Sequence, residues 1–204
     1  NPLTSIKMLV QAAREDISGS LASDDLAIVE REIRRVERSL QTFLDFARPP
    51  QPMKSSADLA HIVDETLELT RGRLSRQHVD LRYKPPDTPV IINGDAGQIR
   101  QVFVNLVLNA LDAMPGGGSL TIELCKRGVD GIVVICDSGP GISAEIHGRL
   151  FQPFASTRET GLGLGLVICK QIVEEHGGHI EATNLPDAGA RFMVRIPLDF
   201  EQKH

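Results

Sequence analysis

The chain has 204 residues, of which 41% are apolar, enough for one or two domains with buried cores. Its net charge of −5 offers no basic surface to a phosphate backbone, and tryptophan is absent, so we exclude nucleic acid as a partner. The three cysteines are far apart in sequence. That spacing fits neither a disulfide framework nor a zinc site and favours free thiols in a reducing cytoplasm.

No stretch approaches the roughly 20 consecutive apolar residues of a membrane-spanning helix, and no signal peptide is visible. The chain begins abruptly at Asn1-Pro2-Leu3, within what reads as the first turns of a helix. We therefore expect a piece of a longer, cytoplasmic protein. Whether an upstream region anchors that protein in a membrane stays open.

The first 48 residues are predicted to form a helical hairpin. Apolar residues recur every three or four positions up to Ile17 and again from Leu26 to Ala47, the second time in an a/d heptad pattern flanked by Glu and Arg. Two such helices bury little by themselves. We expect a homodimer through residues 1–48 that forms a four-helix bundle, with a monomeric hairpin packed on its own globular domain as the alternative.

Three prolines, Pro49, Pro50 and Pro52, end the second helix and predict a stiff linker over 49–54. The remaining residues, 55–204, alternate between helical and strand patterns. Helices are expected at 58–77, 95–114, 143–149 and 163–176, and strands at 79–84, 90–93, 119–126, 131–136, 179–184 and 190–198. Antiparallel strands beside a layer of helices make an α/β sandwich, so the fold class is α+β.

Two asparagines lie one turn apart in the apolar helix at 95–114. Asn105 and Asn109 share one side of that helix and offer two amide oxygens. Mg²⁺ prefers hard oxygen ligands and joins proteins to substrate phosphates, so the pair is a candidate metal site. The alternative is that both amides hydrogen-bond to neighbouring backbone.

Two glycine clusters follow. Asp137 ends a strand just before Gly139 and Gly141, where a carboxylate can accept hydrogen bonds from the exocyclic amine of adenine; an ordinary turn is the alternative. Gly161, Gly163 and Gly165 lead into a helix whose N-terminal amides can bind phosphate.

The segment between the clusters reads as a lid. Phe151 and Phe154 are its apolar anchors, and Arg158 is a cation that either reaches phosphate or is solvated. Histidine side chains can act as phosphoacceptors or metal ligands. The pair His176 and His179 falls at a helix C-cap, and we interpret it as a surface turn.

Together these motifs resemble the sensor histidine kinases of two-component systems along essentially the whole chain. The N-box is 105–110, the first G-box 137–141, the F-box 151–154 and the second G-box 161–166. Asn1-Pro2-Leu3 resembles the tail of the H-box, and 105–118 is similar to the nitrogen-regulation subtype.

This resemblance implies a Bergerat-type ATPase fold after a dimerisation and phosphotransfer hairpin. It implies ATP and Mg²⁺ as ligands, a response regulator receiver domain as partner, and bacterial origin. Asn109 and Asn105 would hold the metal, with Asn105 and Asn1 in catalytic roles. The implied ATP-binding residues are Asn105, Asn109, Asp112, Asp137, Gly139, Gly141, Ile142, Phe154, Thr157, Arg158, Gly161, Leu162, Gly163, Leu164, Gly165 and Leu166.

The chain departs from the family pattern at several positions. The phosphoacceptor histidine is expected four residues before Asn1 and so is missing here. Asp112 and Ala113 replace the frequent Lys-Tyr, and Ala190 stands where a threonine is common. These departures leave two alternatives to a kinase core, a dimeric scaffold that binds nucleotide as a switch and another ATPase of the same superfamily. Asn105 speaks against the second, because those ATPases place a glutamate there.

Overall fold

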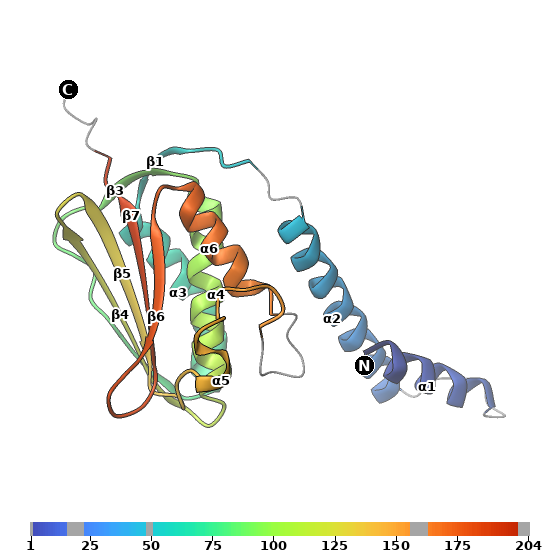
Figure 1. Cartoon of the computed structure of the whole chain (residues 1–204). Helices are drawn as coiled ribbons and strands as arrows, with labels where there is room; N and C mark the ends of the chain where they lie inside the picture. The colour runs from blue at the N-terminus through green and yellow to red at the C-terminus, as the bar shows by residue number, and fades with distance from the viewer. Residues whose placement is uncertain (1, 16–22, 48–50, 156–162, 200–204) are drawn as a thin grey trace. The chain divides into compact units, whose positions relative to one another are not determined.

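The computed structural model describes residues 2–15, 23–47, 51–155 and 163–199 (Figure 1). They form two compact units, the helices of the first 47 residues and the residues from Gln51 onwards. Within these ranges no helix combines the length and the apolarity needed to cross a membrane.

The first unit consists of two helices, α1 (Pro2–Glu15) and α2 (Ser23–Ala47), which pack against each other. Much of the apolar surface of this hairpin faces solvent. Its exposed large apolar residues are Met8, Val10, Leu26, Ile33, Leu40, Phe43 and Leu44. Within the heptad pattern predicted for α2, Leu26, Ile33, Leu40 and Phe43 are therefore uncovered in a single copy of the chain, whereas Val29 and Val36 are half-buried.

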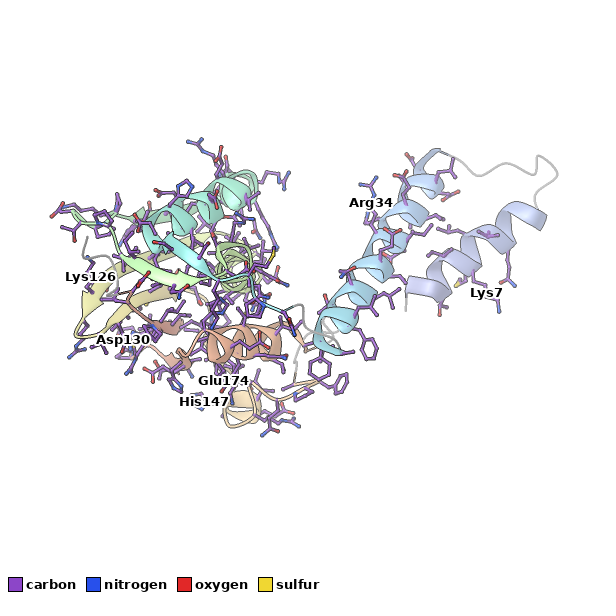
Figure 2. All side chains as sticks on the ribbon, turned by 90° about the horizontal axis from the view of Figure 1, so that it is seen from above. Lys7, Arg34, Lys126, Asp130, His147 and Glu174 are labelled. Carbon is purple, nitrogen blue, oxygen red and sulfur yellow. The ribbon has the colours of Figure 1, made fainter. Side chains whose placement is uncertain are left out.

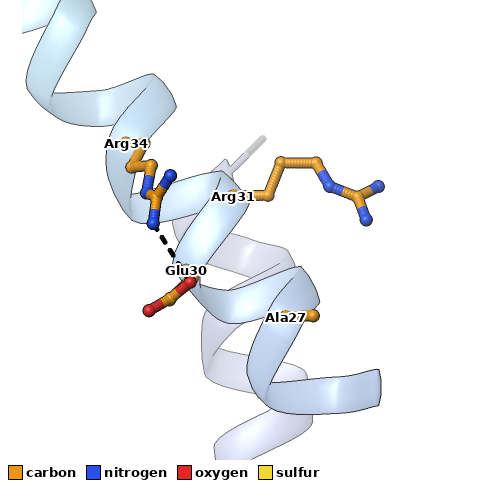
Figure 3. Close-up of a pocket in the computed structure, with 4 residues that line it drawn as sticks. All are labelled: Ala27, Glu30, Arg31 and Arg34. Atoms are coloured by element: carbon orange, nitrogen blue, oxygen red, sulfur yellow. Dashed lines mark hydrogen bonds and ion pairs between the residues drawn. The ribbon is translucent and has the colours of Figure 1, made fainter. Parts of the chain in front are cut away.

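A depression on α2 is lined by Ala27, Glu30, Arg31 and Arg34 (Figure 3). Arg34 donates a hydrogen bond of 3.2 Å to Glu30, while Arg31 extends away from this pair. Both paired side chains are 70% exposed, and such surface pairs contribute little to stability. The depression is thus a feature of one solvated helix surface and does not bring together the predicted nucleotide motifs.

The second unit is a five-stranded sheet with helices over one face (Figure 1). Its strands are β2 (Val79–Tyr83), β4 (Gly118–Arg127), β5 (Asp130–Asp137), β6 (His179–Asn184) and β7 (Ala190–Pro197). Its helices are α3 (Leu59–Arg76), α4 (Ala96–Ala113), the short α5 (Ala144–His147) and α6 (Gly165–Glu175). Two short strands, β1 (Ser55–Asp58) and β3 (Ile91–Gly94), pair separately.

The sheet order is β2-β4-β5-β7-β6, which puts β5 at the centre. Val133 of β5 pairs with Leu124 on one side and with Val194 on the other, and all three are buried. Because side chains alternate between the faces of a strand, Asp137 lies on the same face of β5 as Val133. The strand that builds the core therefore ends in a carboxylate on that core face.

The α+β prediction is confirmed, with two corrections. The strands are not all antiparallel, because β2 at the edge runs parallel to β4. The short strand β1 was not predicted; its sequence, Ser-Ser-Ala-Asp, lacks the β-branched and aromatic residues typical of strands. It forms by pairing with β3, next to the N-cap of α3, where Asp58 accepts hydrogen bonds from the N–H groups of Ala60 and Val90.

Asp95 joins the start of α4 to the segment that follows residue 50. One carboxylate oxygen caps α4 by accepting from Gln98 N–H at 3.1 Å, and the other accepts from Met53 N–H at 2.8 Å. Burial acts to raise the pKa of Asp95, but the backbone N–H groups of Met53, Gln98 and Gly97 outweigh it and hold the pKa below its ordinary value. Beside this contact, Lys54 Nζ donates to the carbonyl of Glu175, next to the C-cap of α6.

We expect Asp95→Ala to lower the free energy of unfolding by about 1–2 kcal/mol, because it removes the cap and the Met53 contact together. Asp95→Asn should cost less, since its amide oxygen still caps α4. A folded-state pKa below the ordinary value means that the carboxylate stabilises the fold above pH 3.8 and that this contribution is lost as pH falls through the lower value.

Chemical denaturation at several pH values measures both effects, with Asp87→Ala in an exposed loop as control. An advantage of wild type over Asp95→Asn that grows on acidification would contradict the prediction.

Candidate functional site

One row of residues along α4 connects the two glycine clusters. Asn105, Asn109 and Ala113 are spaced by four residues, so they share one side of the helix with about 6 Å between successive members. At one end of the row the Asn105 carboxamide lies against Gly165, and at the other end Ala113 lies against Gly139. The middle member, Asn109, is half-buried between these contacts.

The carboxylate of Asp137 is built into the end of the sheet, with the residue only 5% exposed. Its Oδ1 accepts hydrogen bonds from Gly139 N–H at 2.9 Å and from Ala190 N–H at 3.3 Å. A Cβ at Gly139 would lie 2.9 Å from that same oxygen and 3.0 Å from Cβ of Ala113, so only glycine fits there. Two backbone donors therefore fix the orientation of the carboxylate beside the end of α4.

The turn after Asp137 is held by Asn184, a residue that the sequence motifs did not single out. Asn184 Oδ1 accepts from Ile142 N–H at 2.6 Å, and its Nδ2 donates to the carbonyl of Ile142 at 2.9 Å. Gly141 lies beneath this contact with a positive φ of 81°, and a Cβ there would be 2.8 Å from Asn184 Oδ1. Across the turn, a Cβ at Gly189 would overlap the carbonyl oxygen of Asp137.

The second glycine cluster leads into α6, and the structure describes it from Gly163 onwards. Gly163 has a positive φ of 66°, and a Cβ there would lie 2.7 Å from the carbonyl carbon of Phe154. Leu164 is the N-cap residue and is buried, but its side chain cannot cap the N–H groups of the first turn. Leu166, in that first turn, is half-buried.

Phe154 has an unusual conformation for a bulky residue. Its φ is 65° and the residue is 67% exposed, so an aromatic residue stands at the surface with its backbone against Gly163. The predicted lid residues Thr157 and Arg158 and the glycine-loop residues Gly161 and Leu162 lie outside the described residues, as does Asn1.

Asp112 forms an ion pair with Arg73, which joins α4 to α3. Both side chains are about one-third exposed. The acidic residue that replaces the family's usual lysine is therefore accompanied by a cation from a different helix.

The interpretation of His176 and His179 as a surface turn is wrong for His176, which is 5% exposed. Its Nδ1 lies 2.7 Å from the carbonyl of Ile172, and its Nε2 accepts from Asp95 N–H at 2.9 Å. This pattern requires a neutral ring with the proton on Nδ1. Both nitrogens are thus engaged in joining the end of α6 to the start of α4, and neither is offered to a metal.

Comparison with known protein families gives a match over more than half of the chain. Residues 94–200 match the family described as histidine kinase-, DNA gyrase B-, and HSP90-like ATPase. This range includes α4, both glycine clusters and four of the five strands of the main sheet.

Known proteins are similar over almost the entire chain. Sporulation kinase D of Bacillus subtilis is 32% identical over 200 residues, which are 97% of this chain and 39% of that protein. The sensor histidine kinase ZraS of Escherichia coli O157:H7 is 31% identical over 204 residues, covering all of this chain and 44% of that protein. The chain therefore spans less than half the length of these relatives.

Among solved structures, histidine kinase ThkA in complex with the response regulator protein TrrA matches with a TM-score of 0.81 and 26% identity. The match covers 100% of this chain and 59% of the solved chain.

We expect Asn184→Ala to loosen the turn at 139–142, because it removes both hydrogen bonds to Ile142. Exchange of the Ile142 amide proton for deuterium should become roughly three- to tenfold faster. Asn93→Ala is the control, since Asn93 is exposed in the separate β1–β3 pair. Unchanged exchange at Ile142, or the same acceleration in both variants, would refute this role of Asn184.

Proposed function

Since the chain belongs to the histidine kinase-, DNA gyrase B- and HSP90-like ATPases, and among them to the sensor histidine kinases, we propose that it is the catalytic core of a two-component sensor. Residues 55–204 are its ATP-binding domain, 1–48 its dimerisation and phosphotransfer hairpin, and 49–54 the linker. The reaction is transfer of the γ-phosphoryl of ATP to a histidine upstream of Asn1, and then to an aspartate of a response regulator.

The observation that carries this proposal is the row on α4 with a glycine cluster at each end. A nucleoside triphosphate has a base at one end and phosphates at the other, and the row has a fixed carboxylate near one end and uncapped helix amides near the other. The proposal assigns the adenine amine to Asp137 and the base to the turn of Gly139, Gly141 and Ile142.

The phosphates are assigned to the second glycine cluster and the start of α6. Backbone amides that follow glycines can approach phosphate closely, and the helix dipole favours the negative charge. The proposed phosphate-side residues are Gly161, Leu162, Gly163, Leu164, Gly165 and Leu166, with Phe154, Thr157 and Arg158 as a lid and Asp112 at the edge of the site.

Asn109, helped by Asn105, would hold Mg²⁺ through amide oxygens. Both residues are half-buried, and their amide oxygens belong to the hard oxygen ligands that this ion prefers. When bound, the ion neutralises charge on the phosphates. Two neutral amides add no negative charge beside a triphosphate, which suits these residues to that task.

The uncovered apolar residues of α2 support a homodimer. Ile33, Leu40 and Phe43 are each more than 40% exposed in the single chain, and a second hairpin would cover them in a four-helix bundle. The proposed partner is a response regulator receiver domain, supported by the similarity to ThkA, which was solved with the response regulator TrrA. Asn1 is proposed to orient a water that dephosphorylates this regulator.

A nucleotide-binding scaffold without kinase activity remains the second candidate. The ion pair between Asp112 and Arg73 favours the scaffold. Asp112 stands at the position where relatives carry a lysine for phosphate, so the chain has an acidic residue there in place of that cation. The two functions differ in whether phosphate is transferred to protein.

We expect Asp137→Asn to weaken ATP binding by roughly ten- to a hundredfold and to reduce the preference for ATP over GTP. Asparagine keeps an oxygen for the N–H groups of Gly139 and Ala190, so the fold is preserved. It loses the negative charge that attracts an exocyclic amine and repels the guanine carbonyl. Calorimetric titration with both nucleotides measures the change.

Asp130→Asn is the matched control, because Asp130 begins β5 and Asp137 ends it, roughly 20 Å away along the strand. Asp130 is labelled in Figure 2. Equal losses in the two variants, or unchanged selectivity in Asp137→Asn, would show that Asp137 does not recognise the base.

A protein extended upstream of Asn1 to restore a His-Glu pair should incorporate labelled phosphate from [γ-³²P]ATP. The product should be labile to acid and stable to base, as a phosphohistidine is. Replacement of the restored histidine by glutamine is the control and should abolish the label. Nucleotide binding without any incorporation would reject the kinase and favour the scaffold.

A further inference from the structure

A buried thiol lies beneath the proposed nucleotide site. Cys169 is 1% exposed in α6 and follows Gly165 by four residues, so the two share one side of that helix. This side contacts α4 at Asn105. The function proposed above assigns no role to the thiol.

Cys169 and Gly165 together confine the carboxamide of Asn105. Asn105 Nδ2 donates a hydrogen bond of 3.2 Å to Cys169 Sγ. A Cβ at Gly165 would lie 2.7 Å from the same nitrogen and 3.1 Å from Oδ1, so the amide occupies the space that glycine leaves open. The side chain therefore cannot turn freely at this position.

The chemistry of the thiol determines whether the NH₂ group or the oxygen of the Asn105 carboxamide faces the sulfur. Cys169 is a free cysteine, whose thiol offers one S–H donor and sulfur lone pairs that can accept. This S–H group points to the Val102 carbonyl at 3.8 Å, which leaves the sulfur lone pairs to accept from an N–H. A flipped carboxamide would set its oxygen against those lone pairs or require the S–H to leave Val102.

We propose that Cys169 is a positioning residue that holds the Asn105 carboxamide with its NH₂ group toward the sulfur and its oxygen turned away from it. The oxygen is thereby kept available, one helical turn from Asn109, as a ligand for the hydrated cation of Mg-ATP. The inference rests on the proposed nucleotide site, but the contact between the thiol and the amide exists independently of any ligand.

Two substitutions separate orientation from packing. Cys169→Ala removes the acceptor, whereas Cys169→Ser keeps an acceptor and a donor on a smaller atom. Cys125→Ala is the control, because Cys125 is an exposed thiol in β4. Thermal unfolding establishes that each variant is folded before binding is measured.

The first measurement is the side-chain amide signal of Asn105 in ¹⁵N NMR spectra, assigned by its loss in Asn105→Ala. We expect this signal to shift and its protons to exchange faster in Cys169→Ala, to stay close to wild type in Cys169→Ser and to be unchanged in Cys125→Ala. An Asn105 signal that is the same in Cys169→Ala as in wild type overturns the inference, whether or not the protein binds ATP.

The second measurement is nucleotide affinity with and without Mg²⁺. Cys169→Ala should weaken Mg-ATP binding by about three- to tenfold, change Mg-free ATP binding less, and have no further effect in an Asn105→Ala background. Equal losses with and without Mg²⁺ that serine does not restore would mean that Cys169 only packs the core. If wild type binds no ATP, the proposed function fails, and the NMR result alone decides whether the thiol orients the amide.

Discussion

The candidate site depends on one constraint, the fixed orientation of α4 about its own axis. Leu106, Val107 and Leu111 are fully buried, so the helix cannot turn without exposing them. Successive residues are about 100° apart around a helix, which leaves Asn105 and Asn109 at the boundary between core and solvent. Their half-buried state follows from the packing of their neighbours. The same packing directs the row of Asn105, Asn109 and Ala113 toward the two glycine clusters.

Most of the fold could be predicted because its signals are local. Apolar periodicity located all the helices and the five strands of the main sheet to within a few residues. The parallel direction of β2 was missed because the alternation of apolar residues does not reveal in which direction a strand runs relative to its neighbour. Only the pairing with β4 shows that direction. The strand β1 was missed because its backbone pairing with β3, rather than its side chains, makes it a strand.

The candidate site likewise contains residues that lie in local motifs and residues whose roles depend on contacts distant in sequence. The sequence alone singles out Asp137, Gly139 and the asparagine pair as candidates because their motifs are short and contiguous. The roles of Asn184 and Cys169 depend on contacts with residues 42 and 64 positions away, which no local pattern contains. The burial of His176 was missed for this reason too, since a His-Gly-Gly-His sequence reads as a turn and its partner Asp95 lies 81 positions earlier.

The neutral imidazole of His176 has a mechanical consequence. It connects the last turn of α6 to the first turn of α4, while Asn105 contacts Gly165 and Cys169 in the first half of α6. Two helices fastened at separated points move as one body. Met53 and Lys54 bind beside the imidazole connection, so residues 51–54 contact the start of α4 and the end of α6 together.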